Sequence, residues 1–585
     1  MRKTIITSLF VLLSLSAFAA RPNVVLVITD DQGYGDIAAH GNPIINTPAM
    51  DALHAESVRL TNYHVSPTCA PTRGALLSGH YTNRAGPWHT IMGRSFLRPE
   101  STTMGTVFGK NGYKTGMFGK WHLGDNYPYR PQDRGFQEVV NHNGGGVGQT
   151  PDYWNNSYFD DTYFHNGVPT KYKGYCTDVF FQEAKRFIGE SIEANKPFFA
   201  YICTNAPHGP FHVEDRYWKP YVNKVNNERE AIFYGMIENI DDNVADLREF
   251  LDKKGVADDT IFIFTTDNGT ASGEKIFNDD MRGKKGSQYE GGHRVPFFLH
   301  WPKAGLKKPR DIDRLTAHID ILPTLIELCG LKAPLDYSFD GRSLVPLLFR
   351  NKVTWPDRTI ITDSQRVKDP IKWKSSATMT NRWRLINGEE LYDIIKDPSQ
   401  TKDVASQYPE VVKRLRRNYD AWWESVSVLF DKETRIIVGN KNGNPAELTA
   451  HDWITEKAPP WHQSSIRKAQ QGSGFWALNV EKPGKYRIAL RRWPQSVNAA
   501  IAADVAPGEP VPGLEAYRET PGQGIPATSA ILKMGKIDLK KPVTKGAEEV
   551  VFNVNLPKGD IDMYCFFEKA DGSLIGSYYA VVEKL

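Results

Sequence analysis

The sequence predicts an α/β fold in which a central, mostly parallel sheet lies between helices, followed by a small α+β subdomain and a β-rich C-terminal module. Three patterns support this prediction. Continuous apolar runs of strand length recur in the first half of the chain, apolar residues at helical spacing separate them, and short alternating runs dominate near the C-terminus. Strands that alternate with helices are typical of a mostly parallel sheet covered on both faces.

The central strands are predicted where apolar residues are nearly continuous. Residues 23–29 form such a run, and residues 197–203 and 260–265 repeat it. A parallel strand buried on both faces has no solvent side, so its sequence is a continuous apolar run. We therefore expect these three strands in the middle of one sheet.

Two helices are predicted between these strands. Thr47 and Pro48 are a typical helix start, with threonine as N-cap and proline in the first turn, for a helix that continues to about residue 56. Gly255 is a typical C-cap for a second helix. The apolar residues of that second helix recur at helical spacing and are Met236, Ile237, Ile240, Val244, Leu247 and Leu251.

The pattern changes after about residue 348. Residues 383–386 and 390–392 predict a short hairpin, and a helix is expected from about residue 409 to 423. The turn-rich residues 440–445 then indicate a boundary. Alternating runs typical of half-exposed antiparallel strands follow at residues 475–480, 485–490 and 550–554.

A chain of 585 residues exceeds what one hydrophobic core usually organises. We divide it into a signal peptide, a main α/β domain, an α+β subdomain and a β-rich module, at residues 1–19, 20–348, 349–430 and 431–585. Residues 506–529 of the module are rich in proline and glycine, and long loops of this kind are often functional or mobile.

The first residues have the pattern of a secretory signal peptide. Arg2 and Lys3 precede an apolar stretch from residue 5 to 18, and residues 17–19 offer small side chains for cleavage. A membrane anchor is the alternative, but the apolar run is short and Arg21 follows it. We therefore expect a periplasmic or secreted protein without membrane insertion.

Composition excludes two further classes. A net charge of +4 over the whole chain leaves no footprint for nucleic acid. Five cysteines without paired spacing do not form a disulfide scaffold, and whether any of them pair stays open.

Polar side chains follow the predicted central strands at the points where these strands end. Asp30 and Asp31 come directly after residues 23–29, and Asp267 and Asn268 close another strand. Ligands of open α/β sheets bind beyond the carboxyl ends of the strands, so these side chains are expected to meet. Three carboxylates and an amide form an oxygen-rich set that suits calcium, and less readily magnesium.

Three other segments carry a cation or an imidazole beside glycine or proline. Lys120 and His122 lie in residues 112–124, His208 follows the strand at residues 197–203, and Lys285 lies in a basic run. Each residue alone is more often a surface or core-edge side chain than a catalyst. Glycine and proline let the backbone approach a ligand closely, which favours a functional role for the set as a whole.

Cys69, Pro71 and Arg73 form a Cys-x-Pro-x-Arg pattern. An isolated match of this length describes a buried cysteine, a turn proline and a surface arginine equally well. Together with the other four segments, in this order, it resembles the type I sulfatases, the sulfatase branch of the alkaline phosphatase superfamily, over residues 22–430. The resemblance implies an alkaline-phosphatase-like fold and a sulfuric ester hydrolase.

The resemblance also implies that a formylglycine-generating or radical maturation enzyme converts Cys69 to formylglycine (3-oxoalanine), whose hydrate attacks the sulfate ester. One divalent cation, with Ca²⁺ favoured, would be held by Asp30, Asp31, Asp267, Asn268 and the converted Cys69. Residues 73–78 look helical, so residue 69 is expected near a helix N-terminus, where backbone amides and the helix dipole favour an anion.

The remaining roles follow from the same resemblance. Arg73 would steady the hydrate, Lys120 would contact the hydrate and the sulfate, and His122 would take a proton from the non-attacking hydroxyl to expel sulfate. His208 and Lys285 would bind the ester oxygen, and one of them would donate the leaving-group proton. Lys285 fits the family spacing better than the adjacent Lys284.

Two alternatives stay open: a phosphate or phosphonate ester hydrolase of the same superfamily, and a non-catalytic protein that binds sulfated glycans. The preferred hypothesis is that the protein removes sulfate from a sulfated polysaccharide or oligosaccharide. Possible sugar contacts, weighed against ordinary packing, are His80, Tyr81, Arg84, Trp88 and His89 after the Cys69 helix, and Trp453, Trp461, His462 and Trp493 in the C-terminal module.

Overall fold

A computed structural model describes residues 21–334, 337–350, 354–363 and 365–585. The predicted signal peptide lies outside these residues. Five cysteines are described, and all five are buried and unpaired. Among the described residues, no helix is both long enough and apolar enough to cross a membrane.

A ten-stranded sheet forms the centre of the main domain, in the order β11-β2-β10-β9-β1-β8-β4-β5-β6-β7. Its strands are β1 (Asn23–Thr29), β2 (Val58–Leu60), β4 (Lys114–Lys120), β5 (Glu138–His142), β6 (Thr162–His165), β7 (Val168–Lys171), β8 (Phe198–Cys203), β9 (Thr260–Thr266), β10 (Phe297–His300) and β11 (Arg310–Ile312). The three predicted apolar runs are β1, β8 and β9. They pair in parallel in the middle of the sheet, with Val25 between Ala200 and Phe262, as predicted.

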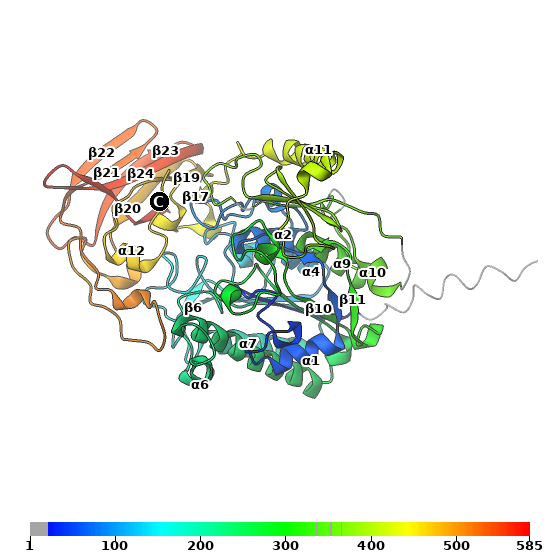
Figure 1. Ribbon diagram of the computed structural model, residues 1–585. Helices are drawn as coiled ribbons and strands as arrows, with labels where there is room; N and C mark the ends of the chain where they lie inside the picture. Colours follow the sequence, from blue (N-terminus) through cyan, green and yellow to red (C-terminus); the bar gives the residue numbers. More distant parts are fainter. Residues whose placement is uncertain (1–20, 335–336, 351–353, 364) are drawn as a thin grey trace, which may run out of the picture.

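Helices cover both faces of this sheet (Figure 1). One layer contains α1 (Pro48–Glu56), α5 (Cys176–Glu193) and α7 (Glu228–Lys253), and the other contains α2 (Cys69–Ser78), α4 (Met104–Lys110) and α9 (Ile321–Leu328). The two faces of the sheet bury separate hydrophobic clusters against these layers. The strand alternation that defines the α/β class is therefore confirmed.

Both predicted helix ends are found, with one correction. Gly255 has φ +69°, and its N–H donates to the carbonyl of Asp252 at 2.9 Å, which closes α7. Thr47 occupies the N-cap position of α1, but its hydroxyl does not cap the helix. It accepts from the N–H of Ala38 instead, at 2.9 Å, and so fixes the preceding turn.

The predicted hairpin is β15 (Trp383–Ile386) with β16 (Glu390–Asp393). It extends a four-stranded antiparallel sheet that also contains β13 (Ile360–Asp363) and β14 (Ser376–Met379). The predicted helix is α11 (Pro409–Ser427), whose buried residues are Leu415, Tyr419, Trp422 and Val426.

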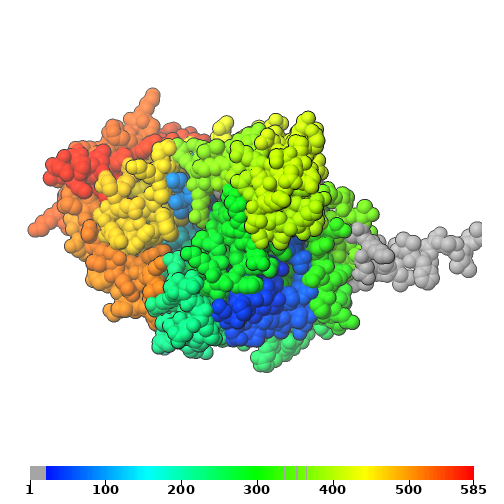
Figure 2. Space-filling view, in the orientation of Figure 1, coloured from blue at the N-terminus to red at the C-terminus, as the bar shows by residue number. Residues whose placement is uncertain are grey.

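Two antiparallel-rich sheets form the C-terminal module and enclose one hydrophobic core. The strands are β17 (Ile436–Val438), β18 (Ala446–Thr449), β19 (Phe475–Val480), β20 (Gly484–Arg491), β21 (Ala527–Met534), β22 (Ile537–Pro542), β23 (Glu549–Leu556), β24 (Gly559–Lys569), β25 (Leu574–Gly576) and β26 (Tyr579–Lys584). Because β17 pairs with β19, the turn-rich residues 440–445 lie inside the module. Figure 2 shows the module, yellow to red, directly against the rest of the molecule.

Candidate active site

Four acidic or amide side chains meet at the carboxyl edge of the central sheet. Asp30 and Asp31 follow β1, and Asp267 and Asn268 follow its neighbour β9. All four are buried. Parallel neighbours end at the same edge, so the sequence positions directly after the strands are brought together in the fold.

Hydrogen bonds connect the members of this group but leave two oxygens without partners. Asn268 Nδ2 donates to Asp31 Oδ1 at 2.8 Å, and the N–H of Asp31 donates to Asp267 Oδ1 at 3.2 Å. Asp30 Oδ1 and Asn268 Oδ1 are buried and have no hydrogen-bond partner within the part of the chain that the structure describes. Unpaired buried acceptors are costly, and a cation is the natural partner for oxygens of this kind.

Two buried cations lie against the carboxylates. Arg73 donates to Asp267 Oδ2 from Nε at 3.1 Å and from Nη2 at 2.9 Å, and Nη1 donates to the carbonyl of Lys120 at 2.7 Å. The Lys120 amine forms an ion pair with Asp30. Guanidinium, ammonium and carboxylates are all fully buried here, so each charge depends on its neighbours for stabilisation.

The two central carboxyls titrate in opposite directions. Burial alone would raise the pKa of Asp30, but the cations around it, Lys120 foremost, hold that pKa well below its usual range. Burial and the charge of Asp30 raise the pKa of Asp267 to about 7. Without a metal, the site therefore disfavours two full negative charges, whereas a bound cation would favour both.

Cys69 is the first residue of α2, as expected from the helical appearance of residues 73–78. It is 2% exposed, and its Sγ lies within 4.8 Å of carboxylate oxygens of Asp30 and Asp267. The helix N-terminus directs backbone amides toward this point. Gly74 lets the helix pack closely, because a Cβ there would lie 2.4 Å from Pro87 Cγ.

The other predicted residues surround the same point. Lys285 Nζ donates to Asp31 Oδ2 at 2.6 Å, and His208 Nε2 lies 3.8 Å from the same oxygen. Lys284 instead pairs with Glu274 at 3.2 Å, with half of its side chain exposed. The geometry is therefore consistent with the choice of Lys285 over Lys284.

The ring nitrogens of both histidines can be assigned from their carbonyl partners. His122 Nε2 lies 2.7 Å from the Thr90 carbonyl and His208 Nδ1 lies 2.7 Å from the Gly209 carbonyl, so each of these nitrogens carries the hydrogen. His122 Nδ1 is buried and has no hydrogen-bond partner among the residues that the structure describes. Burial lowers the pKa of His122 well below its usual value and, together with Lys285, that of His208 to about 4, so both rings are neutral proton acceptors.

A cavity of about 480 Å³ opens above Cys69 and Asp31. Its walls include residues that the sequence analysis did not single out, namely Gln149, Phe211, Arg229, Arg366, Glu515 and Tyr517. Trp461 and His89, which were considered as sugar contacts, also line it. The only signal that pointed toward Glu515 and Tyr517 was the proline and glycine content of residues 506–529.

The C-terminal module reaches the cavity through this loop. Leu514 pairs with Phe211 by two backbone hydrogen bonds of 2.7 and 3.1 Å, and Glu515 forms an ion pair with Arg229 at 2.7 Å. Tyr517 stacks on His462 with ring centroids 5.0 Å apart. The loop is thus fastened to the main domain and forms one wall of the cavity.

The other residues considered as sugar contacts lie elsewhere. The side chains of His80 and Arg84 and the N–H of Tyr81 all bind Asp340. The remaining four have packing or capping roles: Trp88 is buried under the loop at residues 365–371, Trp453 and Trp493 are in the module core, and His462 caps α12 (Gln463–Arg467).

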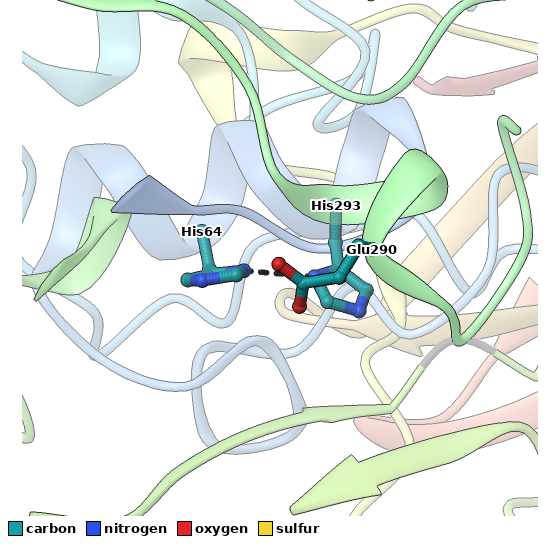
Figure 3. A group of neighbouring side chains, drawn as sticks. All are labelled: His64, Glu290 and His293. Carbon is teal, nitrogen blue, oxygen red and sulfur yellow. Dashed lines mark hydrogen bonds between the residues drawn. The ribbon is translucent and has the colours of Figure 1, made fainter. Parts of the chain in front are cut away.

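A second group with ligand-type side chains lies outside the cavity: His64, Glu290 and His293 (Figure 3). The Nδ1 atoms of the two histidines are 2.9 Å apart and share a hydrogen bond. Glu290 is already neutralised by the buried Arg384, whose Nε donates to it at 2.6 Å. Because the ligands are mutually satisfied and a cation is already present, we assign this group a structural role.

The fold and this arrangement define a hydrolase site of the alkaline-phosphatase type, with oxygen ligands at strand ends and cations around them. A family model for sulfatases matches residues 22–331, and a model for the C-terminal region of N-sulphoglucosamine sulphohydrolase matches residues 283–423. The chain belongs to the sulfatase family and is a type I sulfatase of the alkaline phosphatase superfamily, an enzyme with sulfatase activity.

Known relatives agree with this assignment. Mouse arylsulfatase J is 28% identical over 69% of this chain and 76% of its own length. Human N-acetylgalactosamine-6-sulfatase is 30% identical over 57% of this chain and 66% of its own length. The crystal structure of Ps i-CgsB in complex with k-i-k-neocarrahexaose is 28% identical, covers 69% of this chain and 93% of its own, and superposes with a TM-score of 0.63.

Proposed function

We propose that this sulfatase removes sulfate from a sulfated polysaccharide or oligosaccharide, using a formylglycine formed at Cys69 and one divalent cation. The observation that carries the proposal is the junction of Cys69, at the N-terminus of α2, with a buried carboxylate cluster that has two unpartnered oxygens. A relative named N-acetylgalactosamine-6-sulfatase and a structural neighbour in complex with k-i-k-neocarrahexaose support a carbohydrate substrate.

The cation would be held by Asp30, Asp31, Asp267, Asn268 and the converted residue 69. The donor set is all oxygen once Cys69 is converted, which favours calcium over softer metals. Bound there, the cation would stabilise negative charge on the sulfuryl oxygens. Arg73 and Lys120, whose side chains are fully buried, would add fixed positive charge.

Proton transfers would be divided between residues on two sides of the reacting group. His122 carries its free lone pair on Nδ1 and would act as the base that takes the proton of the non-attacking hydroxyl. Lys285 is the protonated group beside His208, whose Nε2 can only accept, so Lys285 would donate the proton to the leaving oxygen. The net reaction is a sulfate ester plus water to an alcohol plus hydrogen sulfate.

The test uses protein produced with and without a formylglycine-generating enzyme. Mass spectrometry of the peptide that contains residue 69 should show the thiol-to-aldehyde mass loss only in the first preparation. Sulfate release from a panel of sulfated polysaccharides and oligosaccharides, followed by ion chromatography, should depend on that conversion and vanish in Cys69→Ala. An active preparation with only free cysteine would contradict the formylglycine mechanism.

A second measurement separates sulfate from phosphate chemistry. Hydrolysis of 4-nitrophenyl sulfate should be faster than hydrolysis of 4-nitrophenyl phosphate at equal concentration, and a faster phosphate reaction would overturn the assignment of sulfate esters as substrates. We also propose that residues 1–19 are removed on export to the periplasm or medium, which N-terminal sequencing of the mature protein checks.

A further inference from the structure

One cation on the wall of the cavity has no charge partner among the described residues. Lys285 pairs with Asp31, Lys284 with Glu274 and Arg229 with Glu515. Arg366 also lines the cavity, is exposed, and makes no hydrogen bond or ion pair with any described residue. A guanidinium beside an anion-binding site is thus available to a ligand.

The turn that carries Arg366 is held in shape from within. Gln365 spans it: its side-chain amide donates to Asp363 Oδ1 at 2.8 Å and to the carbonyl of Ile371 at 2.7 Å, and its oxygen accepts from the N–H of Ile371 at 2.6 Å. Arg366 itself has φ +47°, in the left-handed region that non-glycine residues rarely occupy. Residues held in this region often lie at ligand sites, because the surrounding structure must maintain them there.

The turn is also fastened to the wall of the cavity. Trp88 Nε1 donates to the carbonyl of Val367 at 3.3 Å, and Arg94 Nε donates to the carbonyl of Lys368 at 3.0 Å. The segment between these two donors includes His89, another lining residue. Arg366 is therefore presented from a fixed platform, which reduces the entropy lost when it binds a ligand.

The charge of Arg366 acts on the interior of the site. Burial is the main cause that lowers the pKa of His89, and Arg366 lowers it further. Arg366 lines the same cavity as Cys69 and Asp31, so an anion bound at its guanidinium can belong to the same small substrate as the scissile sulfate.

We propose that Arg366 binds a second anionic group of the substrate, either a sulfate ester or a carboxylate on the same or the neighbouring sugar. This inference rests on the proposed function. The planar fork of a guanidinium matches both groups by paired hydrogen bonds. The Trp461 and Tyr517 side chains of the C-terminal module supply the apolar surface of the same cavity, against which a sugar ring packs.

The test compares Arg366→Ala with wild type on three sulfated disaccharides. The first carries one sulfate on neutral sugars, the second carries two sulfates, and the third carries one sulfate and one uronate carboxylate. Hydrogen bonds to charged groups contribute about 1.5–3 kcal/mol, so kcat/KM for a dianionic substrate relative to the monoanionic one should fall about tenfold or more in Arg366→Ala. The substrate whose ratio falls identifies the second anion.

The matched control is Arg417→Ala. Arg417 is another exposed arginine without a described partner, but it lies on α11 and does not line the cavity. Its substitution should leave all three ratios unchanged. Equal ratios in wild type and Arg366→Ala, or a wild-type preference for the monoanionic substrate, would overturn the inference. A converted wild-type protein that releases no sulfate from any disaccharide or from 4-nitrophenyl sulfate would instead contradict the proposed function.

Discussion

Replacing Arg73 with methionine tests how the buried charges at the sheet edge are balanced. Methionine keeps most of the buried volume of the side chain but removes its charge and its hydrogen bonds to Asp267 and to the Lys120 carbonyl. Asp30 and Asp267 would then face each other with Lys120 as the adjacent buried cation. The substitution should therefore destabilise the metal-free protein strongly.

The size of the effect follows from the burial of the pair. Removing one partner of a buried ion pair costs about 3–5 kcal/mol. The entropy of unfolding is about 2.1 cal/mol/K per residue. For the roughly 310 residues that the sulfatase model matches, the total entropy of unfolding is therefore about 0.65 kcal/mol/K. The melting temperature of Arg73→Met should therefore lie about 5–8 °C below that of wild type.

Calorimetry in EDTA and then in millimolar calcium is the assay. The variant site is more negative than that of wild type, so calcium should recover more stability in Arg73→Met than in wild type. Arg384→Met is the control: it breaks another buried pair, with Glu290, and Arg384 has no hydrogen bond to any predicted ligand among the described residues, so the variant should lose comparable stability without recovery by calcium. Arg73→Lys keeps the charge and should fall between wild type and Arg73→Met. A melting temperature of Arg73→Met within 2 °C of wild type, or equal calcium recovery in Arg384→Met, would refute this reasoning.

Three further outcomes are expected. Asn268→Ala removes an unpartnered amide oxygen and should weaken calcium binding about tenfold or more. Titration calorimetry on protein from which a chelator has removed the metal measures this affinity, and an unchanged affinity would exclude Asn268 from the ligand set. Gly269→Ala places a Cβ 1.8 Å from the carbonyl oxygen of Gly291 and should abolish soluble yield or activity, whereas Gly189→Ala, with 3.9 Å of clearance on α5, should be tolerated. Burial raises the pKa of Asp363 to about 7, so the folded state holds a proton that the unfolded state releases between about pH 4 and 7. The free energy of unfolding that this group contributes in the wild type therefore falls as pH rises through that range. The melting temperature of Asp363→Asn should rise relative to that of wild type between pH 5 and 8. A difference in melting temperature that does not change with pH would contradict the assigned shift.

The centre of the site could be predicted because its chemistry is recorded in local sequence. Asp30, Asp31, Asp267 and Asn268 each follow an apolar run directly, and a parallel sheet brings such positions to one edge. The helical pattern after Arg73 similarly located residue 69 at a helix N-terminus. Strand length, apolar continuity and the position of the next polar residue were sufficient to predict where these side chains lie, because each of these features is local in the sequence.

The walls of the cavity could not be predicted in the same way. His80, Tyr81 and Arg84 follow the Cys69 helix closely, but Asp340, about 260 residues later, draws all three away from the cavity. Conversely, nothing in the sequence distinguishes Arg366 from other arginines. Its position depends on hydrogen bonds from Trp88 and Arg94 to the backbone of the residues that follow it. Proximity along the chain was therefore a poor guide where a loop's path is set by a distant carboxylate.

The C-terminal module forms part of the cavity wall. Its loop is fixed to the main domain by the Leu514–Phe211 pairing and the Glu515–Arg229 ion pair, on the side of the cavity where His208 lies. The carboxylate cluster follows two strands of the central sheet, whereas Trp461 and Tyr517 come from the C-terminal module, whose core cluster also includes Phe96, Tyr129 and Trp154 of the main domain. Under the proposed function, changes in residues 506–529 would alter the part of the cavity wall that Glu515 and Tyr517 form, without replacing any residue of the carboxylate cluster.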